Sequence, residues 1–176
     1  KLNNKNIGIV GCRECTTYGK KSAEYFAYNL SKQNINIVSG LAKGIDSYAH
    51  LGSLNNGNTI AVLGNGLDMI YPKENLELAN EIVKRGGTII SEYPCGTKPD
   101  KMKFPARNRI ISGISSGIIV IEAKEKSGTL ITVDFALEQG REVFVVPGNI
   151  NSINSVGTND LIKQGARLVT TYEDIS

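Results

Sequence analysis

A dense run of basic residues in the middle of the chain offers the clearest chemistry. The twelve positions 98–109 contain one acid, Asp100, and five of the twenty lysines and arginines: Lys98, Lys101, Lys103, Arg107 and Arg109. Clustered positive charge attracts anions, and the arginine guanidinium suits two-point recognition of phosphate. The run therefore predicts a local anion site.

Pro105 places this run at the start of a helix. Proline is tolerated in a first turn, where its missing N–H would have had no partner, so we expect the helix to begin at Phe104 or Pro105. Arg107 and Arg109 then lie near the positive end of the helix dipole, where cations are unfavourable. They require an external anion or an acidic partner such as Glu92 or Glu122, and both interpretations are open at this stage.

Composition predicts one domain with a local charge feature. The chain has 176 residues, 40% of them apolar, so we expect a single domain over residues 1–176 with its own core. A net charge of +3 is too small for a surface that is basic throughout, so a polyanion site must come from local clustering. No run of about 18 apolar residues occurs, and we expect no membrane span.

The cysteines indicate a reducing compartment. The chain has three cysteines, which is a small and odd number, so they do not form a disulfide scaffold. Unpaired cysteines are typical of a reducing compartment, and we expect a cytoplasmic protein. Cys12 and Cys15 imitate a metal or redox pair, but with one histidine, His50, and no second cysteine pair, the usual four zinc ligands are not available. We expect no metal and no cofactor.

The spacing of apolar residues predicts the fold class. Strand-length apolar runs occupy residues 7–10, 35–38, 59–63, 88–90, 118–121 and 143–146, with a possible last strand at 167–169. Helical spacing is found at 18–33, 45–54, 74–84, 105–114 and 130–139, with a short helix at 158–165. This alternation is typical of a doubly wound, mostly parallel sheet in a three-layer α/β/α, extended Rossmann-like fold.

Three loops are expected to meet at the carboxyl ends of these strands, where open parallel sheets bind ligands. Arg13 follows the first strand, Lys43 follows the second between Gly40 and Gly44, and Ser127-Gly128-Thr129 precedes a helix after the fifth. Backbone N–H groups at helix starts hold phosphates. None of these loops matches the dinucleotide fingerprint or a Walker A loop, so ATP hydrolysis has no support.

Catalytic residues are scarce. His50 is the single imidazole, and it lies within a predicted helix, so we expect a partly buried histidine and not a base. We expect Glu92 and Glu122 to neutralise the arginines. Tyr93 and Phe104 flank the basic run, and an aromatic ring beside a cationic groove is typical of stacking on single-stranded nucleic acid. The sequence thus predicts a binding protein and not an enzyme.

Eight blocks of sequence, in order over about residues 7–168, resemble the DNA-processing protein A family, also called DprA or Smf. They are Gly11-Cys12-Arg13 with Tyr18-Gly19, residues 39–46 with Ala49-His50, residues 59–68 with Tyr71-Pro72, residues 91–94, residues 104–111, Glu122-Ala123 with residues 127–132, residues 140–148, and Gly157-Thr158-Asn159 with Leu161-Ile162 and Gly165-Ala166.

The resemblance implies a Rossmann-like domain of natural transformation that binds and protects single-stranded DNA, loads the RecA recombinase on it, and forms homodimers. It also implies flanking helical and winged-helix-like domains, which we do not expect within residues 1–176, and we place part of the dimer surface near Leu161 and Ile162. The family's DNA site carries over to Arg13, Lys43, Arg107, Asn108, Arg109, Ser127, Gly128 and Thr129, with Lys103 as a flank and Phe104 as a possible stacking residue. Cys12 and Cys95 depart from the family, which commonly has serine and proline there.

Two other functions are open. One is a nucleotide phosphoribohydrolase of related fold, although residues 126–129 read Lys-Ser-Gly-Thr where those enzymes carry Pro-Gly-Gly-x-Gly-Thr. The other is a sensor that binds a small nucleotide without turnover.

Overall fold

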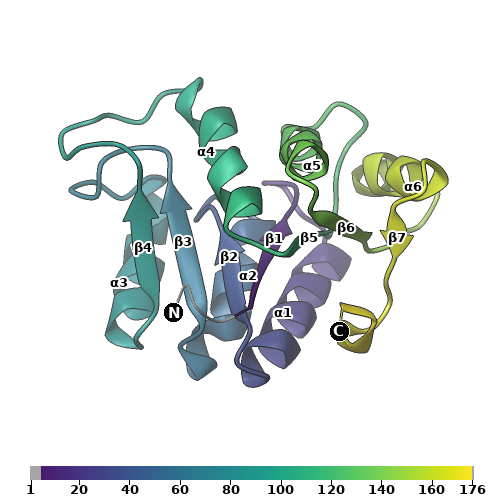
Figure 1. Cartoon of the computed structure of the whole chain (residues 1–176), viewed down its shortest axis with the longest axis horizontal. Helices are drawn as coiled ribbons and strands as arrows, with labels where there is room; N and C mark the ends of the chain where they lie inside the picture. The colour runs from purple at the N-terminus through teal and green to yellow at the C-terminus, as the bar shows by residue number, and fades with distance from the viewer. Residues whose placement is uncertain (1–4, 176) are drawn as a thin grey trace.

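The computed structural model describes residues 5–175, which form one seven-stranded sheet with helices on both faces (Figure 1). All six neighbouring strand pairs are parallel, and the strand order is β4-β3-β2-β1-β5-β6-β7. The strands are β1 (Asn6–Val10), β2 (Asn36–Ser39), β3 (Thr59–Leu63), β4 (Thr88–Ser91), β5 (Gly117–Val120), β6 (Glu142–Val145) and β7 (Arg167–Leu168).

The helices divide between the two faces of the sheet. One face carries α1 (Thr17–Lys32), α2 (Ile45–Ser53) and α3 (Leu76–Lys84); the other carries α4 (Lys103–Gly113), α5 (Thr129–Glu138) and α6 (Val156–Lys163). Short 3-10 turns occur at Leu54–Asn56, Lys73–Asn75, Ile153–Ser155 and, as η4, Tyr172–Ile175. The predicted three-layer, doubly wound α/β class is confirmed.

The core follows from the two-residue period of the strands. Ile7 and Ile9 of β1 pack toward α1, whereas Val10 packs toward α4 and α5. In β5, Ile119 joins the first cluster and Ile118 joins the second. A strand buried on both faces reads as a continuous apolar run, which is why the sequence predicted these strands.

Predicted boundaries differ from the observed ones by a few residues. β2 begins one residue after its predicted start, and β5 begins one residue before its predicted start. α4 begins at Lys103, ahead of the expected Phe104 or Pro105. α3 begins two residues late, at Leu76, because a 3-10 turn occupies Lys73–Asn75. Such turns have no apolar period of their own, so pattern analysis merges them with the helix that follows.

The chain reverses direction across the sheet at β1. It builds β1 to β4 outward on one side, then returns through α4 to place β5 on the free side of β1. In open α/β sheets such a switch point leaves a crevice beyond the carboxyl ends of the two central strands. The loops after β1 and β5, which carry Arg13 and Ser127, border it.

Leu161 and Ile162 were expected on a dimer surface, but both are half-buried and pack against the core from α6. Their helical position directs them inward, onto the apolar face of the sheet. Both keep part of their surface exposed, and the dimer surface stays a prediction. In residues 5–175, no helix has the length and apolarity that crossing a bilayer requires.

The buried side chain of His50 hydrogen-bonds to the backbone of the loop that follows β2. Its ring is fully buried, Nε2 accepts a hydrogen bond from the Leu41 N–H at 3.2 Å, and Nδ1 lies 2.8 Å from Thr59 Oγ1. Because Nε2 accepts, the proton is on Nδ1 and is donated to Thr59. Leu41 adopts a left-handed conformation (φ 57°), and its carbonyl accepts from Asn75 Nδ2 at 2.7 Å. His50 is thus a structural histidine, as the sequence predicted.

His50 should make stability depend on pH. Burial, with the charge of Arg107, lowers the pKa of His50 from 6.5 to about 3. Between these values the unfolded chain binds a proton that the folded chain does not, so stability is lost as pH falls below 6.5. We expect wild type to lose about 2 kcal/mol more than His50→Gln between pH 6.5 and pH 5, measured by urea unfolding. Equal losses would contradict a neutral buried imidazole, since the carboxylates are common to both proteins.

Gly44, at the start of α2, should tolerate no side chain. Its φ is +77°, and an added Cβ would lie 2.2 Å from the Arg13 carbonyl oxygen. Gly86 has a similar φ of +83° but open space around it. We expect Gly86→Ala to cost about 1 kcal/mol in unfolding free energy and Gly44→Ala about 3 kcal/mol or more. A similar cost at both positions would show that close approach of the Arg13 loop does not constrain the fold.

Candidate functional site

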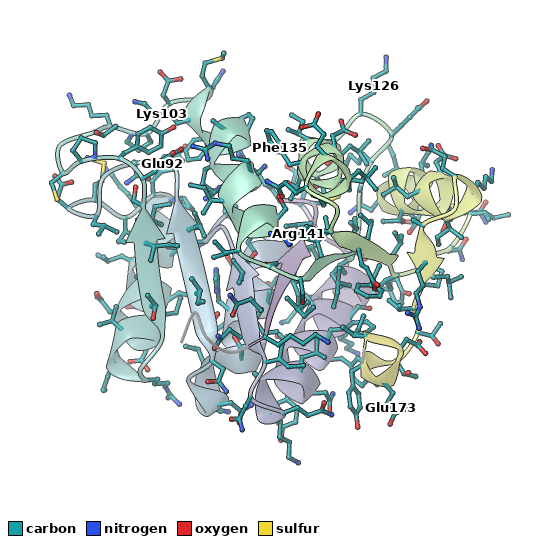
Figure 2. All side chains as sticks on the ribbon, viewed as in Figure 1. Glu92, Lys103, Lys126, Phe135, Arg141 and Glu173 are labelled. Carbon is teal, nitrogen blue, oxygen red and sulfur yellow. The ribbon has the colours of Figure 1, made fainter. Side chains whose placement is uncertain are left out.

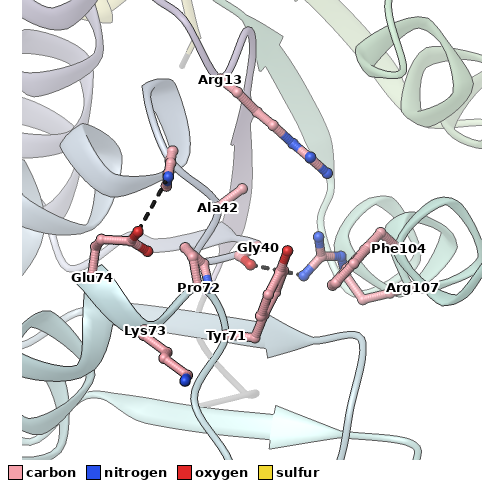
Figure 3. Close-up of a pocket in the computed structure, with 10 residues that line it drawn as sticks. Arg13, Gly40, Ala42, Tyr71, Pro72, Lys73, Glu74, Phe104 and Arg107 are labelled. Atoms are coloured by element: carbon pink, nitrogen blue, oxygen red, sulfur yellow. Dashed lines mark hydrogen bonds and ion pairs between the residues drawn. The ribbon is translucent and has the colours of Figure 1, made fainter. Parts of the chain in front are cut away.

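Two adjoining cavities lie beyond the carboxyl ends of the central strands, and we call them together the rim site. Both are lined by Arg13, Ala42, Tyr71, Phe104 and Arg107. The first, of about 300 Å³, adds Gly40, Lys43, Pro72, Lys73 and Glu74 (Figure 3). The second, of about 500 Å³, adds among others Asp46, Lys101, Asn108, Ser127, Gly128 and Thr129.

Most of the residues predicted for binding therefore meet in one place. The rim site collects eight of them from four separate loops and helix starts: Arg13, Lys43, Phe104, Arg107, Asn108, Ser127, Gly128 and Thr129. Lys103 and Arg109 do not line either cavity. The convergence follows from the parallel sheet, since the carboxyl ends of its strands share an edge.

Arg13 is the exposed cation of the rim site. It lies in the loop between β1 and α1, and its guanidinium carbon is 5.8 Å from the centre of the Phe104 ring. Among residues 5–175, no carboxylate forms an ion pair with it. Figure 3 shows its side chain extending over the cavity toward Phe104 and Arg107. An exposed arginine without an acidic partner is available to an anionic ligand.

Arg107 is held as part of the fold. Only 4% of it is exposed, and its Nη1 donates to the carbonyl oxygens of Gly40, at 2.7 Å, and Val62. The Asp46 carboxylate lies beside it and accepts from the Gly40 N–H at 3.1 Å. Burial raises the pKa of Asp46, and the Arg107 guanidinium opposes that rise. The compensating acid is thus Asp46, and neither Glu92 nor Glu122 pairs with Arg107 in the described residues.

An aromatic stack forms one wall of the rim site. The rings of Phe104 and Tyr71 are stacked, with centroids 5.4 Å apart and planes 20° from parallel. Arg107 approaches the Phe104 ring at 5.7 Å, and Gly64 lets the ring lie against the backbone, because a Cβ there would be 2.8 Å from Phe104 Cδ1. Sequence reasoning missed Tyr71 as a site residue. The available signal was an aromatic residue in the loop after the third strand.

The start of α5 faces the second cavity. Ser127 Oγ accepts from the Thr129 N–H at 3.1 Å, so the hydroxyl fixes the turn that begins the helix. A helix N-terminus carries partial positive charge and attracts anions. Lys126, the preceding residue, points away from the sheet at the tip of this loop (Figure 2). The sequence predicted this arrangement for Ser127, Gly128 and Thr129.

Lys103 and Arg109 belong to a second group on the β4 side of α4. Arg109 forms an ion pair with Glu92, as the sequence predicted for one of the arginines. Lys103 Nζ donates to the Lys98 carbonyl oxygen at 3.0 Å and lies 5.8 Å from the centre of the Tyr93 ring. Figure 2 shows Lys103 and Glu92 on the same side of the molecule, beyond the end of β4.

In the rim site itself, Lys43 pairs with Glu74 at 3.4 Å, and both side chains are exposed.

Glu122 has a role that the sequence did not predict. Its carboxylate is buried and accepts from Thr16, from the backbone N–H at 2.9 Å and from Oγ1 at 2.7 Å. Thr16 Oγ1 in turn accepts from the Gly19 N–H at 3.1 Å, capping α1. The expectation that Glu122 neutralises an arginine is therefore wrong, because the end of β5 lies beside the start of α1.

The three cysteines, two of which resembled a metal or redox pair in the sequence, are all free thiols. Cys12, Cys15 and Cys95 are free, and burial raises the pKa of the Cys12 and Cys15 thiols, which disfavours the reactive thiolate. Across residues 5–175 no three His, Cys, Asp or Glu side chains are grouped as metal ligands.

The whole chain, residues 1–176, matches the family model for DNA recombination-mediator protein A. It is 49% identical over 172 residues to DNA processing protein DprA of Bacillus subtilis, covering 97% of this chain and 58% of that protein. It is 47% identical over 175 residues to Protein Smf of Escherichia coli, covering 99% of this chain and 47% of that protein. The chain thus spans about half the length of these curated relatives.

Solved structures of DNA processing protein A from two bacteria have the same fold as this chain. DNA processing protein A of Streptococcus pneumoniae superposes with a TM-score of 0.91 at 47% identity, covering 99% of this chain and 61% of that one. A structure describing the single-stranded DNA binding mode of DNA processing protein A from Helicobacter pylori gives a TM-score of 0.91 at 34% identity, over 99% of this chain and 80% of that one. A molybdenum cofactor binding protein of Rippkaea orientalis, with a TM-score of 0.69 and 16% identity over 99% of this chain and 94% of that one, shares the fold alone. The chain belongs to the DNA recombination-mediator protein A family.

Proposed function

We propose that residues 1–176 act as one domain that binds single-stranded DNA in the rim site without chemical turnover. The observation that carries the proposal is the exposed, unpaired Arg13 above the stacked rings of Phe104 and Tyr71. The structure that describes single-stranded DNA binding by the Helicobacter pylori relative supports it.

The rim site offers what a single strand presents. Arg13, Lys43 and Lys101 supply positive charge for phosphates, and the start of α5 adds backbone N–H groups. Tyr71 and Phe104 supply aromatic faces for bases, which stack without regard to sequence because every base has such a face. Arg107 contributes by positioning Phe104 and Asn108, since its own charge is compensated by Asp46.

A single strand fits better than a duplex. The cavities, of about 300 and 500 Å³, adjoin each other beyond the carboxyl ends of the strands, and Tyr71 and Phe104 line both. In a duplex the base faces are stacked on one another and unavailable to Tyr71. Binding through stacking therefore requires unpaired bases.

The wider role follows the family. We propose that the domain protects incoming single strands in natural transformation, acts in the cytoplasm, and passes strands to the RecA recombinase. We also propose a homodimer, for which the exposed side chains of Ile150, Ile153 and Leu168 around α6 offer apolar surface beside the half-buried Leu161 and Ile162. Sedimentation of the purified chain tests the dimer, and strand-exchange assays with RecA test the transfer.

Two of the candidate bases for the hydrolase alternative are engaged in other contacts. His50 is buried with its pKa lowered to about 3, and Glu122 caps α1 through Thr16. Incubation with nucleoside monophosphates, followed by assay for free base, tests this alternative directly.

Affinity should rise with strand length. We expect an oligonucleotide of about 20 nucleotides to bind at least tenfold more tightly than a mononucleotide, and more tightly than a duplex of equal length at equal salt, because several phosphates and bases are engaged. Fluorescence anisotropy measures all three. Saturable mononucleotide binding with no gain from longer strands would favour the small-nucleotide sensor.

Arg13→Ala should weaken single-strand binding and reduce its dependence on salt. Each phosphate contact contributes about −0.7 to the slope of log affinity against log salt, so the slope should become shallower by about 0.7. Arg85→Ala is the matched control, because Arg85 is an exposed arginine of the α3 end that pairs with Glu81 far from the rim site. Equal slopes for wild type and Arg13→Ala would contradict the proposal.

A further inference from the structure

The solvent face of α1 carries an aromatic and basic stripe that lies outside the buried core. Tyr18, Lys21, Tyr25, Tyr28 and Lys32 follow one another at alternating intervals of three and four residues, which places them on one side of a helix. The three tyrosines are 48%, 39% and 45% exposed, and no acid falls within this spacing. We call these five residues the tyrosine stripe.

The opposite side of α1 does the packing. Ala23, Phe26, Ala27 and Leu30 are buried against the sheet and α2. The tyrosine stripe is therefore free of a role in the main core. Three of the chain's seven tyrosines, gathered on one exposed helix face beside two lysines, form a surface suited to a ligand with flat rings and negative charge.

The head of the stripe reaches the edge of the sheet that holds the rim site. Helix α1 begins at Thr17, four residues after Arg13. A hollow of about 500 Å³ lies there, lined by Thr16, Tyr18, Pro147, Gly148, Asn149, Ser152 and Ser155. A second hollow, of about 300 Å³, shares Tyr18 and Pro147 and continues past Lys21, Ser22 and Tyr25. Hydroxyl, amide and aromatic groups line this path, and no carboxylate does.

The rings of the stripe are partly fixed in place. The Tyr18 hydroxyl donates to the Pro147 carbonyl oxygen. Tyr25 meets Phe26 and Tyr172 edge to face, with centroids 5.2 and 6.1 Å apart. Aromatic groups that are already oriented lose less conformational entropy when a ligand stacks on them.

We propose that the tyrosine stripe binds the continuation of the DNA strand held in the rim site. The inference rests on the proposed function and extends it to a second surface. From Tyr18 to Tyr28 the helix rises about 15 Å, the length of about four stacked nucleotides. Lys21 lies within this length and Lys32 about one turn beyond it, where both can meet phosphates.

Acids border the path at several places. Glu24 of α1 is half-buried and directly precedes Tyr25. Glu14 lies between the rim site and the stripe, and it pairs with Lys124 at 3.9 Å, so its charge is partly compensated. Glu173 lies in η4, which packs beside α1 and whose Tyr172 contacts Tyr25 in the middle of the stripe (Figures 1 and 2). A polyanion would therefore follow the side of the tyrosine stripe that faces away from η4.

Oligonucleotides of two lengths distinguish binding at the rim site from binding at the tyrosine stripe. An oligonucleotide of about 5 nucleotides fills the rim site alone, whereas one of about 20 nucleotides also covers the stripe. We expect Tyr28→Ala to leave the short strand's affinity unchanged and to weaken the long strand about tenfold, through loss of one stacked base. Tyr28→Phe keeps the ring and should bind as wild type does.

The lysines give an independent readout. Lys21→Ala combined with Lys32→Ala should make the salt slope of the long strand shallower by about 1.4, with no change for the short strand. Lys84→Ala, an exposed lysine on α3, is the matched control. Circular dichroism confirms that each variant is folded.

The outcomes are distinguishable. Failure of wild type to bind either strand overturns both the proposed function and this inference. Long-strand binding that falls in Arg13→Ala but not in Tyr28→Ala or the double lysine variant overturns the inference alone. A change in self-association without a change in DNA affinity also overturns it, since the stripe would then be a protein contact.

Discussion

The buried guanidinium of Arg107 is the constraint on which the rim site depends. It joins the start of α4 to the end of β2 through the Gly40 carbonyl and to β3 through the Val62 carbonyl, with Asp46 of α2 balancing its charge. Loss of one partner from such a buried set leaves an uncompensated charge, which costs several kcal/mol. Phe104 and Asn108, on the same helix, are positioned by this anchor, and Gly40 has no room for a side chain beside it.

This anchor also decides where anions are attracted. Because Arg107 is compensated by Asp46 and Arg109 by Glu92, neither contributes its full charge to the surface. Arg13, Lys73 and Lys101 line the rim site without an ion pair in the described residues, and Lys43 shares its charge with Glu74. Stacking rings between these cations make the edge of the sheet amphipathic, and the tyrosine stripe repeats this combination along α1.

Much of the fold was predictable from the sequence, because doubly buried strands need continuous Ile and Val runs and parallel strands bring their following loops together. That logic placed Arg13, Lys43 and Ser127 correctly at one edge. It did not place Glu122, whose partner Thr16 is 106 residues away in the chain and is set by strand order. Nor did it separate Arg107 from Arg109, since the rotation of α4 about its axis directs one inward and the other toward Glu92.

Amide hydrogen exchange with and without a single-stranded oligonucleotide tests the central claim most directly. The account predicts slower exchange in four segments that adjoin the rim site: residues 11–16, 40–46, 101–108 and 127–130. The opposite end of the sheet, including the turn at Leu54–Asn56, should not change. Protection confined to that opposite end, with none in the four segments, would contradict the account.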